Sequence, residues 1–211
     1  IFNQRVLLVE GNLNTPHLGI HLGLVNVNSI HGALNSGKSL MDVIYSHNSG
    51  LKLILGDILI KGFNNRDFVK AVRNLNGLFD YVVVDSAAGL GNETLNFLDA
   101  VDKAIIVVNP DILSCTEGLR LIKLLGNKGK TVLGVILNKV NNEKHEISKE
   151  DAEIMLGKRI LIEIPEDSIF RKALSEGKSL VHGYSNHKIS EKYKELGAFL
   201  VGKTYKNKFR Q

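Results

Sequence analysis

The chain is 211 residues long, and its 44% hydrophobic and 23% charged residues are the balance of an ordinary folded protein with one good-sized core. A single cysteine, Cys115, excludes an internal disulfide framework and a Cys-x-x-Cys metal or cluster site, and it favours a cytoplasmic location. The net charge of +5 permits contact with DNA or with an anionic membrane but requires neither.

Short β-branched runs alternate with longer helical stretches along the whole chain. Most of the runs are continuously apolar, which is typical of strands covered on both faces. The alternation predicts an α/β fold of three layers, α/β/α, with a mostly parallel sheet, in a single domain over residues 1–211. In chain order, the expected strands are 5–9, 51–55, 81–84, 104–108, 132–137 and 159–162, and the expected helices lie near 66–77, 92–101, 116–127, 149–156 and 186–201.

Residues 15–24 are expected to form a helix after the first strand. Thr15 is a suitable N-cap, Pro16 suits the first turn, and apolar residues follow at helical spacing. His17 and His21 lie four residues apart, a spacing that can bind a metal, but no third ligand accompanies them. A pair on the helix surface is the favoured interpretation.

The stretch Gly32–Ser39, GALNSGKS, matches the G-x-x-x-x-G-K-[ST] pattern of a nucleotide phosphate loop. A working phosphate loop follows a buried strand, whereas asparagines interrupt the apolar residues over 25–31. The stretch instead favours a helix that ends at Gly37, followed by a second helix over 38–45. Lys38 would then be a surface lysine, and the match to the pattern would be a coincidence.

A different junction carries stronger signs of nucleotide chemistry. The largely hydrophobic segment FDYVVV over residues 79–84 delivers Asp85 at the end of an expected strand. Nucleotide hydrolases use an acid at such a position to hold a Mg²⁺-bound water, because Mg²⁺ keeps several waters and takes few carboxylates. The small residues of Ser86–Gly91, SAAGLG, would let the backbone approach a phosphate.

Four motifs, in matching order and spacing, resemble the MinD/ParA group of deviant phosphate-loop ATPases, which position division sites and partition cargo. Arg5–Leu18 (RVLLVEGNLNTPHL) is similar to the second strand and first switch of that family. Asp85–Gly91 (DSAAGLG) is similar to its second switch, Ile164–Asp167 (IPED) to its turn near the base, and Val108–Asp111 (VNPD) also fits. The resemblance covers about residues 5–200 and implies a P-loop NTPase-like fold of the deviant Walker class.

The resemblance implies a metal and phosphate site. Asp85 would hold Mg²⁺ with the help of Glu10, and Gly89 would contact the γ-phosphate. Asn12 stands where the family orients the attacking water, so it would be the catalytic position. The family has aspartates at the places of Glu10 and Asn12, and an amide brings no charge and accepts no proton. Turn formation at the end of the strand is the alternative role for both residues.

The same resemblance implies a base site and partners. Asn138, Pro165 and Asp167 would line the purine base. ATP and Mg²⁺ would promote a face-to-face homodimer, hydrolysis would release it, and an activator protein would be a further partner. The inner membrane face and DNA are alternative surfaces for peripheral association.

The family's own phosphate loop, K-G-G-x-G-K-T, precedes its first switch and is not in this sequence. The chain starts at Ile1 and not at a methionine, so we expect a protein truncated at its N-terminus, with that loop upstream. Residues 30–45 fill the place of a helix-turn-helix in the family, which agrees with Lys38 as a bystander.

Three functions stay open at this point. The first is a slow ATPase, converting ATP to ADP and phosphate, that acts as a dimerisation switch in positioning a division site, a cargo or a chromosome. The second is a nucleotide-binding scaffold without turnover, because Asn12 replaces an aspartate. The third is a DNA-associated partitioning factor, which the positive net charge permits.

Two further features favour structural roles. Cys115 lies at an expected helix start without a nearby histidine or second cysteine, so we expect a small buried residue. Residues 188–210 alternate basic and apolar side chains, but Gly202 and Thr204 interrupt the periodicity of a membrane-binding helix. An ordinary last helix followed by a frayed basic tail is the favoured interpretation.

Overall fold

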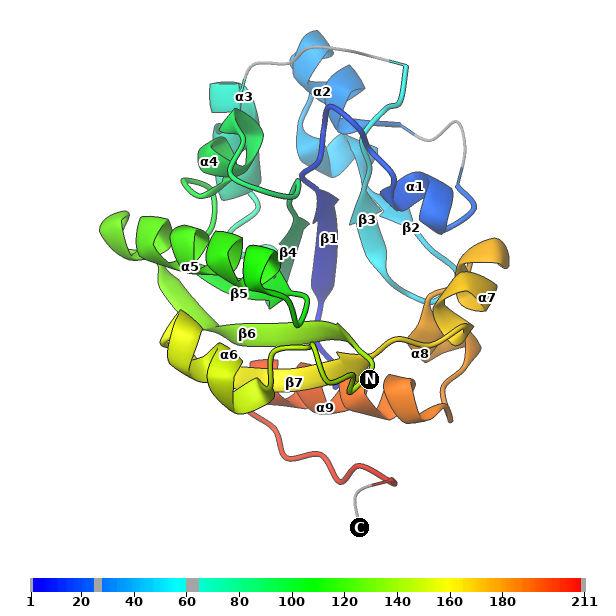
Figure 1. Cartoon of the computed structure of the whole chain (residues 1–211). Coiled ribbons are helices and arrows are strands. Elements are labelled where there is room, and N and C mark those ends of the chain that lie inside the picture. The colour runs from blue at the N-terminus through cyan, green and yellow to red at the C-terminus, as the bar shows by residue number, and fades with distance from the viewer. Residues whose placement is uncertain (1, 25–27, 60–64, 210–211) are drawn as a thin grey trace. The chain divides into compact units, whose positions relative to one another are not determined.

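The computed structural model of the chain describes residues 2–24, 28–59 and 65–209 (Figure 1). The chain forms two compact units. The N-terminal unit consists of residues 3–101 with 174–178, and the C-terminal unit consists of residues 102–173 and 179–209 with Phe2. Each unit contains a mostly parallel sheet with helices packed on it, which confirms the predicted α/β class.

The sheet of the N-terminal unit has the strand order β2-β3-β1-β4. Strands β1 (Val6–Glu10), β3 (Lys52–Ile54) and β4 (Tyr81–Asp85) are parallel, and the two-residue β2 (Tyr45–Ser46) is antiparallel to β3. Register pairs Glu10 with Asp85. The two acids therefore end neighbouring strands at the same edge of the sheet.

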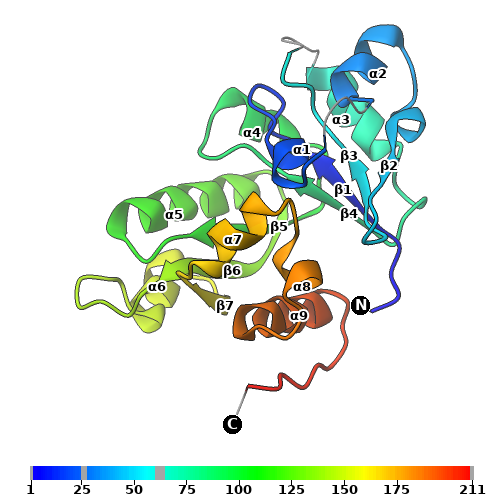
Figure 2. The same cartoon turned by 90° about the vertical axis from the view of Figure 1, so that its right-hand side faces the viewer.

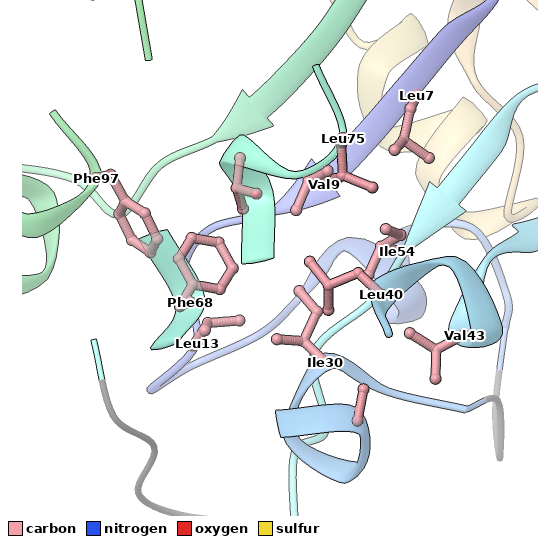
Figure 3. Packing of buried hydrophobic residues seen from close by; sticks show 12 residues of the cluster. Leu7, Val9, Leu13, Ile30, Leu40, Val43, Ile54, Phe68, Leu75 and Phe97 are labelled. Carbon is pink, nitrogen blue, oxygen red and sulfur yellow. The ribbon is translucent and has the colours of Figure 1, made fainter. Parts of the chain in front are cut away.

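The helices of this unit are α1 (Leu18–His21), α2 (Ile30–Ser36), the 3₁₀-helix η1 (Leu40–Val43), α3 (Asn65–Arg73) and α4 (Asn92–Phe97). Apolar side chains of α2, η1, α3 and α4 pack against β1 and β3 in one core (Figure 3). Phe68 of α3 and Phe97 of α4 meet edge to face, with ring centroids 4.7 Å apart. This core supports the sheet edge at which Glu10 and Asp85 lie.

The phosphate-loop pattern at Gly32–Ser39 is a coincidence, as predicted. Its first five residues belong to α2, whose N-cap is Ser29, and Gly37 ends the helix with a left-handed φ of 67°. Lys38 is exposed. The second helix expected over 38–45 is instead η1 followed by β2.

The long helix expected over 15–24 is wrong. Only the four residues of α1 are helical, and the N-cap is His17, without a bond from its own side chain. Thr15 therefore does not cap the helix. The N–H groups at the start of α1 are instead bound by a side chain from β1, as described below.

The expectation that the strands are covered on both faces is wrong for β4. Val82 and Val84 pack against the core, but Tyr81 and Val83 on the opposite face are exposed, the latter by 47%. Alternate residues of a strand point to opposite faces, so a continuously apolar run does not by itself show that both faces of the strand are buried. Within the described residues, β4 pairs only with β1, and β5 of the other unit pairs only with β6.

The C-terminal unit contains a parallel sheet in the order β5-β6-β7, formed by Lys103–Val108, Thr131–Val140 and Ile160–Pro165. Helices α5 (Ile112–Asn127) and α6 (Lys149–Leu156) cover one face, and α9 (Lys188–Leu200) covers the other (Figure 2). The sequence did not indicate the short helices α7 (Ile169–Ser175) and α8 (Leu180–Gly183). None of the helices described combines the length and apolarity that crossing a bilayer takes.

The expectation of a frayed basic tail is wrong for residues 203–209. Glu191 of α9 is fully buried and pairs with Lys194 at 2.8 Å. Its other carboxylate oxygen accepts bonds from the Tyr205 hydroxyl at 2.9 Å and the Lys208 N–H at 3.2 Å. The tail is thus fixed to the last helix by a buried polar network. Such a long-range contact leaves no trace in local periodicity.

Candidate functional site

The first part of the candidate site lies where β1 and β4 end. The N–H of Gly11 donates a 2.7 Å bond to the carbonyl oxygen of Asp85, so the two loops that follow these strands touch at their first residues. A Cβ atom on residue 11 would lie 2.8 Å from that oxygen and 2.8 Å from the side chain of Val84. Only glycine allows this approach.

Asp85 is the last residue of β4 and lies where the two loops begin. The residue is exposed, yet partial burial of its carboxyl raises the pKa, the negative charge of Glu10 raises it further, and His21 acts in the opposite direction. Two acids so close favour a cation between or beside them. No three His, Cys, Asp or Glu side chains among the described residues form a metal cage. A single carboxylate suits Mg²⁺, which retains its waters.

Glu10 is held differently from Asp85. Its side chain is only 2% exposed, and its two oxygens accept three backbone N–H groups. Oε1 accepts from His17 at 2.5 Å and from Leu18 at 2.8 Å, and Oε2 accepts from Gly56 at 2.9 Å. The carboxylate therefore joins the loop after β1 to the loop after β3. The expected contribution of Glu10 to metal binding stays a prediction.

Asn12 is half-buried in the loop after β1. Its Oδ1 accepts bonds from the Thr15 hydroxyl at 3.0 Å and, more weakly, from the Thr15 N–H at 3.4 Å. This is the turn-forming role that the sequence offered as the alternative to catalysis. The carboxamide nitrogen is the group left to bind a water, and the catalytic role stays a prediction.

Gly89 lies in the loop after β4. Its φ of 76° is left-handed, and a Cβ there would meet no atom within 4 Å. The backbone conformation, and not packing, therefore calls for glycine. The buried Thr94 fixes the same loop by donating from its hydroxyl to the Ala87 carbonyl at 3.1 Å.

The second part of the candidate site belongs to the C-terminal unit. Asn138 near the end of β6 is in register with Ile164 of β7, and Pro165 is the last residue of β7. Asp167 follows two residues later and accepts the Ile169 N–H at 3.0 Å.

Two basic side chains, from α9 and its N-cap, approach the same aspartate. Its Oδ2 lies 3.8 Å from the Nζ of Lys188 and 3.9 Å from the Nε2 of His187. The three residues expected to line a base thus share one end of the β6–β7 pair. Whether they meet Asp85 in one pocket stays a prediction, because the two sets belong to different units.

The sequence did not reveal the loop after β3. His31 of α2 is fully buried, and its Nδ1 accepts the Asp57 N–H at 3.0 Å. Burial lowers the pKa of His31, although Asp57, Glu10 and the Leu13 backbone favour the charged ring. The signal that could have found this loop is its place at the carboxyl end of a parallel strand.

Two expectations about isolated side chains can be compared directly with the structure. The rings of His17 and His21 are exposed and stack with centroids 6.2 Å apart, in agreement with a surface pair. Cys115 is confirmed as a small buried residue. It is 0% exposed, and burial together with Asp111 raises the pKa of its thiol.

Comparisons with known proteins point in one direction, although no family model matches the chain. An uncharacterized ATP-binding protein of Methanocaldococcus jannaschii is 28% identical over 203 residues, which are 94% of this chain and 77% of that protein. The septum site-determining protein MinD of Pyrococcus horikoshii, solved with Mg-ADP, has a TM-score of 0.87 and 26% identity over 93% of this chain and 83% of its own. A MinC:MinD cell division complex of Aquifex aeolicus gives 0.86 and 25% over 99% and 88%.

Proposed function

This chain is a homologue of the MinD/ParA family ATPases, and from that premise we propose that it binds ATP with Mg²⁺ and acts as a slow, nucleotide-dependent dimerisation switch. The observation that carries the proposal is the register of Glu10 and Asp85 at the ends of neighbouring parallel strands, locked by the bond between Gly11 and Asp85. Ligands of open parallel sheets bind beyond such strand ends.

Asp85 holds the metal in this proposal. Its exposed carboxyl has a raised pKa beside Glu10, so a cation relieves an unfavourable pair of charges. When bound, Mg²⁺ would neutralise charge on the phosphates. Gly89 supplies a loop whose backbone is open to a phosphate, because a Cβ at residue 89 would meet no atom within 4 Å. Asn12 offers an amide to a water but no base, which supports slow turnover.

Asn138, Pro165 and Asp167 recognise the base in this proposal. They share one end of β6 and β7, and Asp167 is fixed by the Ile169 N–H with Lys188 nearby. Residues 1–211 would then act as one nucleotide-binding domain. The phosphate groups would need further donors, such as the family's phosphate loop.

The switch would serve spatial positioning, of a division site or a cargo. MinD of Aquifex aeolicus forms a complex with MinC, and we infer that this chain has an activator or effector protein of its own. A second candidate is a nucleotide-binding scaffold without turnover. The engagement of Asn12 Oδ1 by Thr15 favours it, because a side chain committed to a turn is less available to a water.

The test is binding of a fluorescent ATP analogue to the full-length protein, with and without Mg²⁺. Asp85→Asn should weaken the Mg²⁺-dependent affinity about tenfold or more. Glu150→Gln, which removes an exposed carboxylate from α6, is the control and should have no effect. Equal affinity of wild type and Asp85→Asn for the ATP analogue in Mg²⁺ would contradict the proposed role of Asp85 in metal binding. ATP hydrolysis measured on the same protein separates the switch from the scaffold.

A further inference from the structure

Glu10 lies at the β1–β4 edge, and its carboxylate is bound by backbone groups. Its carboxylate is 2% exposed and accepts three N–H groups from two separate loops. A carboxylate held by two or three backbone N–H groups is a fixed charge with little freedom to turn toward a ligand.

The first of the two loops follows β1 and leads into α1, whose first N–H groups bind Glu10. Leu18 is the first residue of that helix and His17 its N-cap, and His17 provides no side-chain cap of its own. Glu10 Oε1 accepts both of their N–H groups, so a residue of β1 caps the helix across the loop. The loop in between carries Asn12.

The second loop, which follows β3, is hydrogen-bonded to α2. The N–H of Ile30 donates to the Leu55 carbonyl at 2.8 Å, and the Nδ1 of His31 accepts the Asp57 N–H at 3.0 Å. A Cβ on Gly56 would lie 2.6 Å from the Cβ of Pro16, so the first loop is packed directly onto the second. Glu10 Oε2 binds the N–H of Gly56 itself.

We propose that Glu10 is a positioning residue: it clamps the loop that carries Asn12 against the loop after β3, and it is not a ligand of the metal. For its effect on turnover this inference rests on the proposed function. The clamp itself does not, because it is made by atoms of this chain alone. Glutamate is needed for length, since an aspartate at residue 10 is one methylene shorter and cannot reach both loops.

Two substitutions distinguish the clamp from a metal ligand. Glu10→Asp keeps a carboxylate, which a metal could still bind, but loses the reach across two loops. Glu10→Gln keeps the length but turns one acceptor into an N–H₂ group, which faces a backbone N–H and cannot accept from it. If Glu10 is a clamp, both variants should loosen the contact between the two loops. If Glu10 is a metal ligand, Glu10→Asp should be tolerated.

The first measurement is amide hydrogen exchange of the full-length protein without nucleotide. In each variant the amides of at least one of the two loops, His17 with Leu18 or Gly56, should exchange about tenfold faster or more. Glu153→Gln is the matched control, because Glu153 Oε1 accepts the Ile160 N–H at 2.7 Å in the other unit. The glutamine oxygen can still accept the single Ile160 bond, so this amide and the other three should exchange as in wild type. Unchanged exchange at the three amides in Glu10→Asp would overturn the clamp.

The second measurement separates affinity from turnover. With Mg²⁺-ADP, Kd for both Glu10 variants should stay within about twofold of wild type, while kcat for ATP falls about tenfold. Tenfold weaker Mg²⁺-ADP binding by Glu10→Gln, with normal binding by Glu10→Asp, would make Glu10 a metal ligand and overturn the proposal. If the protein binds no ATP at all, the proposed function fails, but the exchange experiment still tests whether Glu10 clamps the two loops. Failure of the proposed function and failure of the clamp are therefore distinguishable.

Discussion

The N–H of Gly11 and the carbonyl oxygen of Asp85 are joined by a 2.7 Å hydrogen bond between the loops that follow β1 and β4. No side chain fits between them, since a Cβ on residue 11 would lie 2.8 Å from the oxygen. This contact brings the catalytic position Asn12 and the metal position Asp85 of the proposed function to one edge of the sheet.

Gly11→Ala should therefore lower the free energy of unfolding by about 1–3 kcal/mol, because the backbone must shift to admit a methyl group. The matched control is Gly126→Ala near the end of α5, where a Cβ meets no atom within 4 Å. That change should be neutral or raise the free energy of unfolding by about 0.4–1 kcal/mol. Urea denaturation measures both. Equal stability of the two variants would contradict the close contact at Gly11.

Buried His31 makes stability depend on pH. Its pKa in the folded chain is lowered below the ordinary value, so the unfolded chain takes up a proton first as the pH falls. The melting temperature should hence decline as the pH drops below about 6.5, the ordinary pKa of histidine, and this effect should be absent above it.

His31→Asn should flatten that decline, since an amide oxygen can accept the Asp57 N–H without titrating. The exposed His145 is the control, and His145→Asn should keep the slope of the wild type. A decline of the same size in His31→Asn and wild type would show that another group is responsible.

The buried Glu191 fixes the C-terminal tail. The Lys194 ammonium and the other donors around Glu191 lower the pKa of its carboxyl to about 2, so the carboxylate and its bonds to Tyr205 and Lys208 persist below the ordinary glutamate range. Because the folded pKa is lowered, the stabilisation is present above about 4.5 and is lost as the pH falls toward about 2. Glu191→Gln should release the tail at neutral pH.

Limited trypsin digestion measures this release as cleavage after Lys203 and Lys206. Cleavage should be several times faster in Glu191→Gln than in wild type, and Tyr205→Phe should lie in between because it removes one of the bonds. Glu153→Gln should digest like wild type. An unchanged rate in Glu191→Gln would mean that the tail is held by other contacts.

The amide at residue 12 limits turnover in the proposed function. Asn12→Asp should raise kcat for ATP about tenfold or more, because a carboxylate can orient a water and accept its proton. Asn12→Ala should lower stability slightly through loss of the Thr15 bonds, without raising kcat. No rise in kcat with Asn12→Asp would contradict the role given to this position.

The sequence predicted regular elements well where local pattern governs them. Continuous apolar runs predicted β1, β5 and β6, although Val107 of β5 is 58% exposed, and Gly37 predicted the end of α2 because its φ is left-handed. Features that depend on contacts between residues far apart in the sequence were not predicted. Thr15 and Pro16 predicted a helix start that the structure places at His17, where Glu10 supplies the cap.

The residues of the candidate site also fall into those that local sequence could place and those that it could not. The place of Asp85 and of the small-residue loop that carries Gly89 could be predicted, since both follow an apolar strand, and their roles stay predictions. The role of Glu10 could not, because one partner, Gly56, lies 46 residues further along the chain. The hold of Glu191 on Tyr205, 14 residues away, is equally invisible to periodicity.

The most direct test of the proposed nucleotide site is an NMR titration of the full-length protein with Mg²⁺-ATP. The account predicts that the amides of Gly11, Asp85 and Gly89 shift together with those of Asn138 and Asp167, all with one Kd. A titration that moves only one of these two sets of amides, or neither, would contradict the proposed nucleotide site.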